Sequence, residues 1–164
     1  MDYEVVIEIP KGSRNKYEAD HETSEIWLDR LLFTATQYPT DYGYFPQTLA
    51  DDGDPLDALV LLDESTFPGC HIRARPVAVF WMQDEKGADA KVLCVPATDP
   101  RWDHVQDMGD LPSYLLEEIG HFFDVYKDLE HGADTVIGGW HGRPYADEVI
   151  AEGRAAFRTS HTPA

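Results

Sequence analysis

The chain has 164 residues and a formal charge of −18 at pH 7, because 13 Lys and Arg side chains stand against 31 Asp and Glu side chains. A negative field of this size disfavours anionic partners, so we expect neither nucleic acid nor a membrane as a partner. The length and the 43% share of hydrophobic residues indicate one globular domain over residues 1–164 with a core of its own.

The sequence favours a protein of a reducing compartment. No apolar run approaches about 20 residues, and the first residues lack the basic and apolar regions of a signal peptide. Cys70 and Cys94 have no metal-binding spacing, and two free thiols are the simpler interpretation. We therefore expect a cytoplasmic location.

The first two thirds of the chain have the pattern of strands and turns. Alternating apolar residues and β-branched runs mark the strand candidates. These lie at residues 3–9, 16–18, 26–30, 58–62, 73–82 and 91–95. The last two form a hairpin with a polar tip at residues 84–87. Residues 38–46, which are rich in aromatic side chains and prolines, are predicted to form a stiff loop.

The last third of the chain changes to a helical period. Apolar side chains at spacings of three and four predict a helix that begins near Pro112 and ends near Lys127. This stripe consists of Leu111, Leu115, Ile119, Phe122 and Tyr126. A second helix is expected to begin at Pro144, after the break at residues 138–139. The predicted fold class is mainly β with added α, a small β-barrel with two helices in its C-terminal half.

Carboxylates concentrate in the turn Asp52-Gly53-Asp54-Pro55-Leu56-Asp57. Two unit charges about 5 Å apart repel by about 3 kcal/mol at an effective dielectric constant of about 20. A turn held by Gly53 and Pro55 cannot spread its charges freely, so it either raises a pKa or binds a cation. The EF-hand pattern does not fit, because Leu56 stands where that loop needs an oxygen ligand. By itself, an acidic turn is most often a solvated surface feature.

The hairpin tip offers carboxylates that could complete a metal site. Asp84 and Asp89 flank the tip, and Asp89 shares one face of the returning strand with Lys91. Oxygen ligands without clustered Cys or His suit Mg²⁺ or Mn²⁺ rather than zinc. A plain charged hairpin tip remains the alternative interpretation.

Cations and phenols near the ends of several predicted elements add the groups that phosphate needs. These are Lys16, Arg30, Tyr38, Tyr42, Tyr126 and Lys127. Arginine binds phosphate through two nitrogens, lysine acts as a point charge, and tyrosine is a neutral donor. Each fits an ordinary surface role when taken singly. Together with several metal ions, they predict a site for a small, highly charged phosphate.

In this combination the chain resembles the soluble, metal-dependent inorganic pyrophosphatases of the bacterial and eukaryotic type. The Asp-x-Asp-Pro-x-Asp core at residues 52–57 matches the hallmark of that family. The similarity continues in the same order through residues 9–12, 15–18, 38–43, 84–91 and 126–130. It is strongest to the short actinobacterial members, and no functional motif is recognised over residues 131–164.

The resemblance implies an OB-like five-stranded β-barrel with flanking helices, usually assembled as a homohexamer. It implies hydrolysis of inorganic pyrophosphate to two orthophosphates with several Mg²⁺ ions per active site, and with Mn²⁺ as an alternative metal. The metal ligands that it implies are Glu8, Glu18, Asp52, Asp57, Asp84 and Asp89. The substrate ligands that it implies are Lys16, Arg30, Tyr42, Lys91, Tyr126 and Lys127, with Tyr38 near the same pocket.

The expected mechanism is direct in-line attack by a water that bridges two metal ions, without a covalent intermediate. The geometry of such a water favours Asp54 as the proton acceptor, whereas the resemblance also offers Asp89 for this role. Both assignments stay open at this point.

Three other functions compete with this prediction. An OB-type binding module could stack bases on the aromatic residues 38–45, but such modules need a basic groove that a charge of −18 does not favour. A calcium-binding structural domain is weakened by the failed EF-hand comparison. Another small phosphoanhydride hydrolase is the nearest enzyme alternative, although the sequence has no Walker-type loop.

Overall fold

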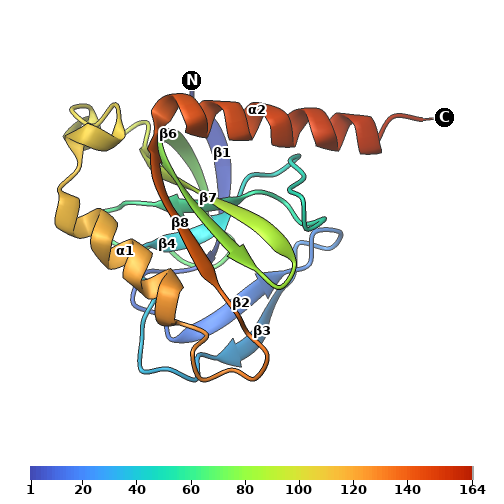
Figure 1. Ribbon diagram of the computed structural model, residues 1–164. Helices are drawn as coiled ribbons and strands as arrows, with labels where there is room; N and C mark the ends of the chain where they lie inside the picture. The colour runs from blue at the N-terminus through green and yellow to red at the C-terminus, as the bar shows by residue number, and fades with distance from the viewer. Residues whose placement is uncertain (164) are drawn as a thin grey trace.

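Five strands close into a ring in the computed structural model, which describes residues 1–163 (Figure 1). In order around the ring they are β1 (Tyr3–Ile9), β4 (Asp41–Tyr44), β5 (Asp57–Val60), β7 (Gly87–Pro96) and β6 (His71–Asp84). The pairing of β6 with β1 closes the ring. Among the pairs of adjacent strands in this ring, β5 and β7 run parallel to each other and the other pairs are antiparallel. The predicted OB-like five-stranded barrel is confirmed. Ala164, the last residue of the predicted domain, lies outside the described residues.

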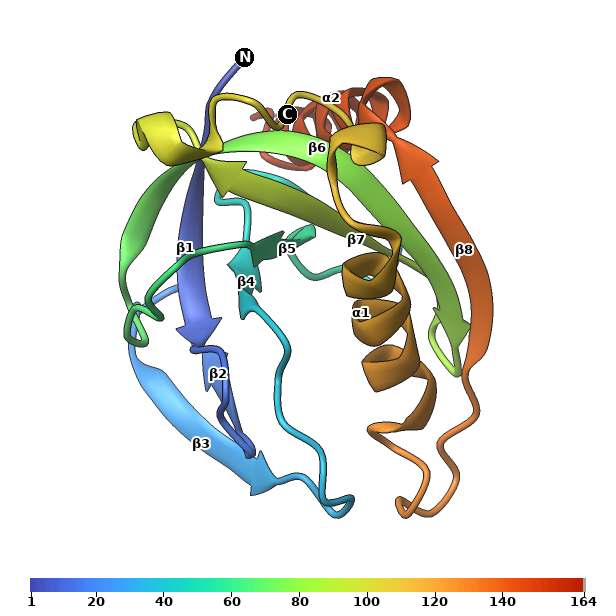
Figure 2. The same cartoon turned by 90° about the vertical axis from the view of Figure 1, so that its left-hand side faces the viewer.

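The other elements are attached around this barrel (Figure 2). They are β2 (Asn15–Ala19), β3 (Ile26–Leu31), η1 (Pro100–Trp102), η2 (Met108–Asp110), α1 (Ser113–Val125), β8 (Val136–Gly142) and α2 (Arg143–Ser160). Strands β2 and β3 form a separate two-stranded sheet, whereas β8 extends the barrel sheet along the outer edge of β6. Helix α1 lies beside β8, and α2 lies across one end of the barrel (Figure 1).

The prediction of a loop at residues 38–46 is wrong, because these residues contain strand β4. β4 pairs with β1 on one side and with β5 on the other, and this pairing supplies its backbone hydrogen bonds. A Cβ atom on Gly43 would lie 1.9 Å from the backbone oxygen of Val6, so only glycine allows the close approach of β1. Locally this glycine resembles a loop residue, although its role is to let two strands meet.

No strand was predicted around residues 138–139, but both glycines lie inside β8. Gly138 falls at an irregularity in the pairing of β8 with β6, and Gly139 has a φ of +91°. Gly138 is thus the extra residue of a bulge, and the left-handed backbone of Gly139 beside it is a conformation that glycine adopts without strain. The glycines therefore bend a strand rather than end one.

Both predicted helices are present with slightly different ends. α1 begins at Ser113, with Pro112 as its N-cap, and ends at Val125, so Lys127 lies just past the helix. α2 begins at Arg143, one residue before the predicted Pro144. Element ends commonly differ by one or two residues because terminal turns fray.

The core has two parts, one under each helix. Under α1, the side chains of Phe80 and Phe123 are each 1% exposed, and their rings lie 6.1 Å apart. Under α2, Val79 of β6 packs in the same cluster as Ile150, and both are fully buried. Burying a side chain of this size contributes about 1.5–3 kcal/mol. The first part of the core fixes the end of α1, where Tyr126 and Lys127 follow.

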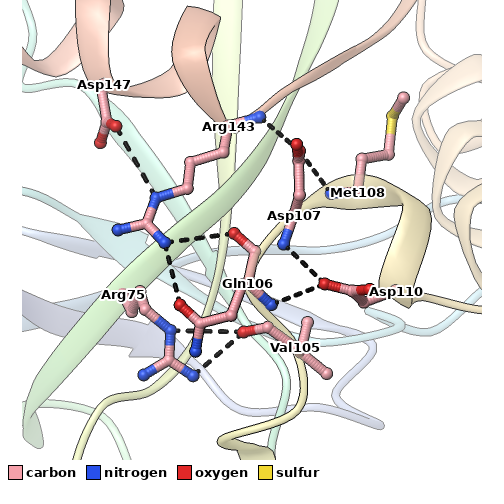
Figure 3. A network of polar contacts seen from close by, with 8 residues as sticks. All are labelled: Arg75, Val105, Gln106, Asp107, Met108, Asp110, Arg143 and Asp147. Carbon is pink, nitrogen blue, oxygen red and sulfur yellow. Dashed lines mark hydrogen bonds and ion pairs between the residues drawn. The ribbon is translucent and has the colours of Figure 1, made fainter.

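A polar network fastens the start of α2 to the barrel (Figure 3). Asp107 Oδ1 accepts hydrogen bonds from the backbone N–H groups of Met108 at 2.7 Å and Arg143 at 2.8 Å. Arg75 of β6 donates to the backbone oxygen of Val105. The loop before α1 thus joins β6 to α2, which keeps the C-terminal part of the chain in place.

Both cysteines are free, as predicted; Cys94 is buried and Cys70 is partly exposed. Burial raises the pKa of the Cys94 thiol. Within residues 1–163, no helix has both the length and the apolar character that crossing a bilayer requires.

Candidate active site

One cavity brings together most of the residues that the sequence analysis selected. Its carboxylates are Glu8, Glu18, Asp52, Asp54, Asp57, Asp84 and Asp89. Its cations and phenols from the predicted set are Lys16, Tyr42, Lys91, Tyr126 and Lys127. Arg30 lines an adjoining outer cavity that also includes Lys16 and Lys127. Tyr38 lines neither cavity; it is buried behind Tyr42, with ring centroids 5.5 Å apart.

The acidic turn of residues 52–57 leads directly into β5. Gly53 has a φ of +87°, and the backbone N–H of Asp54 donates to Asp52 Oδ1 at 3.0 Å. Partial burial, together with the nearby charges of Asp54 and Asp89, raises the pKa of Asp52. Asp57 is the first residue of β5, so its backbone is held in the barrel while Asp54 stays exposed on the turn.

Lys91 occupies the centre of the acidic cavity. β5 and β7 run parallel, and their register places Asp57 beside Lys91. Lys91 Nζ donates to Asp57 at 2.9 Å, to Asp89 at 3.0 Å and to the Tyr42 hydroxyl at 3.2 Å. Burial by itself lowers the pKa of Lys91, but the carboxylates around it outweigh burial and raise that pKa well above its usual range. All three N–H donors of this buried ammonium are therefore in use.

Two acidic groups that line the cavity, Glu8 and Tyr42, have raised pKa values. Glu8 on β1 is 8% exposed and accepts a 2.7 Å hydrogen bond from the Ala19 backbone N–H. Burial raises the pKa of Glu8 to about 7, and the charge of Asp57 adds to this effect. Burial also raises the pKa of Tyr42 well above its usual range, so its hydroxyl stays a neutral donor.

Three cations of the outer cavity come from the small sheet and from the segment after α1, and Lys86 comes from the β6–β7 hairpin. Lys16 on β2 is paired in register with Arg30 on β3, and Asp29 bonds to both cations. Arg30 Nη2 also lies 2.8 Å from Glu130 Oε1. Lys127 lies over the ring of its neighbour Tyr126, 5.4 Å from the ring centroid.

Sequence reasoning missed several residues that contribute to this arrangement. Asp29 and Glu130 pair with the predicted cations, and His21, Tyr44 and Lys86 line the main cavity. Asp29 precedes Arg30 in the chain, and Glu130 closes the segment 126–130 that the resemblance includes. Nothing in the spacing tells which carboxylate reaches which cation, because the partners come from separate elements.

The donors in the cavity fit hard divalent cations. They are carboxylate oxygens, which suit Mg²⁺ and Mn²⁺. Within residues 1–163, no three Asp, Glu, His or Cys side chains lie close enough together to hold an ion as they stand. Mg²⁺ keeps several waters and uses one or two carboxylates plus substrate phosphates, so the open arrangement suits ions of that kind better than a closed structural site.

The arrangement of the aromatic residues 38–45 does not support an OB-type binding module. Tyr38 is 2% exposed and Phe45 is 1% exposed, so both belong to the core rather than to a stacking surface. The cavity beside them is lined by carboxylates, which repel a nucleic-acid backbone.

A barrel with a cavity of carboxylates and cations is the arrangement expected of a class of protein, the metal-dependent hydrolases of phosphate compounds. The family model described as inorganic pyrophosphatase matches residues 5–158. With this match the chain belongs to the inorganic pyrophosphatase family, as the sequence resemblance indicated.

Individual relatives agree with this assignment. The chain is 58% identical over 153 residues to the inorganic pyrophosphatase of Leifsonia xyli, covering 93% of this chain and 94% of that protein. It is 56% identical over 158 residues to that of Streptomyces coelicolor, covering 96% and 97%. The crystal structure of the inorganic pyrophosphatase from Thermus thermophilus has a TM-score of 0.92 and 47% identity, covering 96% of this chain and 91% of that one.

Proposed function

We propose that this chain hydrolyses inorganic pyrophosphate to two orthophosphates, as an inorganic diphosphatase that uses Mg²⁺. The observation that carries the proposal is the single cavity in which seven carboxylates face the predicted phosphate ligands. Membership of the inorganic pyrophosphatase family supports the choice of substrate. Mn²⁺ is the alternative metal, because it prefers the same oxygen donors.

Metal ions have a defined place in this proposal. Asp52, Asp57 and Asp89 would hold a first ion, and Asp57 would share a second one. Asp84 and Asp89 would bind a further ion that arrives with the substrate. Glu8 and Glu18 would support these ions directly or through water. When bound, the ions neutralise pyrophosphate and lower the pKa of the attacking water.

Asp54 is the proton acceptor in this proposal. Its side chain is exposed on the turn, and its backbone is fixed by the hydrogen bond to Asp52. Asp89, the other candidate, is held by the ammonium of Lys91 at 3.0 Å. That hydrogen bond occupies Asp89 Oδ2, whereas the exposed Asp54 side chain makes no ion pair within residues 1–163. The structure of the turn therefore favours Asp54.

Cations and neutral donors would bind the two phosphate groups from two sides. Lys16, Arg30 and Lys127 would approach from the outer cavity. Lys91 and Tyr42 would approach from the barrel, and Tyr126 from the segment after α1. They stabilise the charge that develops on the leaving phosphate. No side chain needs to form a covalent bond with the substrate.

Phosphate release from pyrophosphate tests the proposal. We expect rapid release with Mg²⁺ and none above background with EDTA, and we expect Asp54→Asn to be at least about 100-fold slower. Asp51→Asn is the matched control, since Asp51 is exposed, precedes the same turn and lies outside the main cavity. If the wild type releases no phosphate with Mg²⁺, the proposed function is wrong. Wild-type speed in Asp54→Asn would instead reject its role as the base.

Assembly and location also belong to the proposal. The family resemblance supports a homohexamer in the cytoplasm. Light scattering would then give a mass of about six times the 18.5 kDa of one chain, and a monomer would reject the hexamer.

A further inference from the structure

Arg30 pairs with carboxylates from two different elements. Asp29, its neighbour on β3, bonds to one end of the guanidinium. Glu130, which follows α1 by several residues, bonds to Nη2 at 2.8 Å. The pair Arg30–Glu130 therefore joins the small β2–β3 sheet to the segment of residues 126–130.

Burial separates this pair from an ordinary surface salt bridge. The side chain of Arg30 is 24% exposed and that of Glu130 is 15% exposed. Exposed pairs contribute little and are easily broken, whereas partly buried pairs are screened less. Arg30 Nε and Glu130 Oε2 are buried without hydrogen-bond partners among residues 1–163. Within residues 1–163, the bond to Arg30 is therefore the only contact of this kind made by the Glu130 side chain.

Segment 126–130 is held at both ends. At its start, the Tyr126 side chain is 6% exposed in the core, and the Tyr126 backbone oxygen accepts a hydrogen bond from Thr34 at 3.3 Å. At its end, Glu130 binds Arg30. A backbone hydrogen bond of 2.9 Å from Glu130 N–H to the Lys127 oxygen connects these two ends. Lys127 lies between the two anchors, so the ion pair also constrains where Lys127 can be.

We propose that Glu130 is a positioning residue for phosphate binding. Through its bond to Arg30 it fixes the guanidinium and sets the distance between Arg30 and Lys127 across the outer cavity. Glu130 does not touch the substrate; its effect is to fix the two cations before the anion binds, which lowers the entropy lost on binding. This inference rests on the proposed role of Arg30 and Lys127 as phosphate ligands.

A matched pair of variants tests the inference. Glu130→Gln removes the charge of the carboxylate, and Asp128→Asn makes the same change two residues earlier, at an exposed side chain. We expect Glu130→Gln to raise KM for pyrophosphate about 10-fold with kcat within about 3-fold of wild type. Asp128→Asn should leave both values within about 2-fold. A KM in Glu130→Gln that is unchanged, or lower than in the wild type, would overturn the inference.

A double-mutant cycle decides whether Glu130 acts through Arg30. In an Arg30→Met background, Glu130→Gln should change KM by less than about 2-fold, since its partner is already absent. An undiminished 10-fold rise in that background would reject the mechanism. If Glu130→Gln does not fold, Glu130→Asp replaces it, and only a KM raised several-fold supports the inference. Phosphate release by the wild type distinguishes the failure of this inference from the failure of the proposed function. An inactive wild type rejects the proposed function. A normal KM in an active Glu130 variant rejects the inference alone.

Discussion

The two sides of the cavity are built in different ways. The inner side consists of barrel strands and the turn of residues 52–57, and most of its side chains are carboxylates. The outer side consists of the β2–β3 sheet and segment 126–130; it carries the cations Lys16, Arg30 and Lys127, with Glu18 as its one predicted metal ligand. On the inner side one buried cation, Lys91, joins two carboxylates. On the outer side one carboxylate, Asp29, joins two cations.

This reversed arrangement of charges indicates that the barrel and the elements attached to it have different roles. A closed barrel holds carboxylates in fixed places despite their mutual repulsion, and metal ions require such fixed oxygen ligands. The attached sheet and segment carry the cations that would bind the anion in the proposed function. The comparison predicts that changes on the inner side affect both stability and chemistry, whereas changes on the outer side mainly affect substrate affinity.

The largest effect is expected for Lys91→Met. This change leaves Asp57 and Asp89 without the ammonium that they share, and breaking a buried pair costs about 3–5 kcal/mol. We also expect phosphate release to fall at least about 100-fold, because a donor inside the cavity is lost. Urea unfolding and the phosphate assay measure the two effects. Lys11→Met, at an exposed lysine, is the control. Equal stability of the two variants would show that Lys91 does not hold the carboxylates of the inner side together.

A smaller effect is expected from the buried acid Glu8 in metal-free protein. Burial raises its pKa from 4.5 to about 7, so the folded state holds this proton more tightly than the unfolded state. Its contribution to stability is complete below pH 4.5 and is lost as the pH rises through about 7. The full loss in the free energy of unfolding is about 3 kcal/mol. Urea unfolding in EDTA should therefore show that the free energy of unfolding declines between pH 5 and 8, and that Glu8→Gln reduces this decline. Identical slopes of this free energy against pH in the two proteins would contradict the assignment.

The sequence was sufficient for most strands of the barrel and for many residues of the cavity, but not for the pairing of these residues. Alternating strands and the apolar stripe of α1 are local patterns, and both appear where expected. Strands β4 and β8 were missed because Gly43 and Gly138 resemble breakers until the opposite strand is known. The bond between Arg30 and Glu130 joins residues 100 positions apart, and only the folded chain shows it.

Calorimetric titration of Mg²⁺ into two variants tests the division between the two sides most directly. Asp52→Asn changes a carboxylate of the inner side that makes no ion pair within residues 1–163, and Arg30→Lys changes a cation of the outer side. We expect Asp52→Asn to weaken the first Mg²⁺ site at least about 10-fold, since one of its oxygen ligands loses its charge. Arg30→Lys should leave that affinity within about 2-fold of wild type. Wild-type Mg²⁺ affinity in Asp52→Asn would contradict the account.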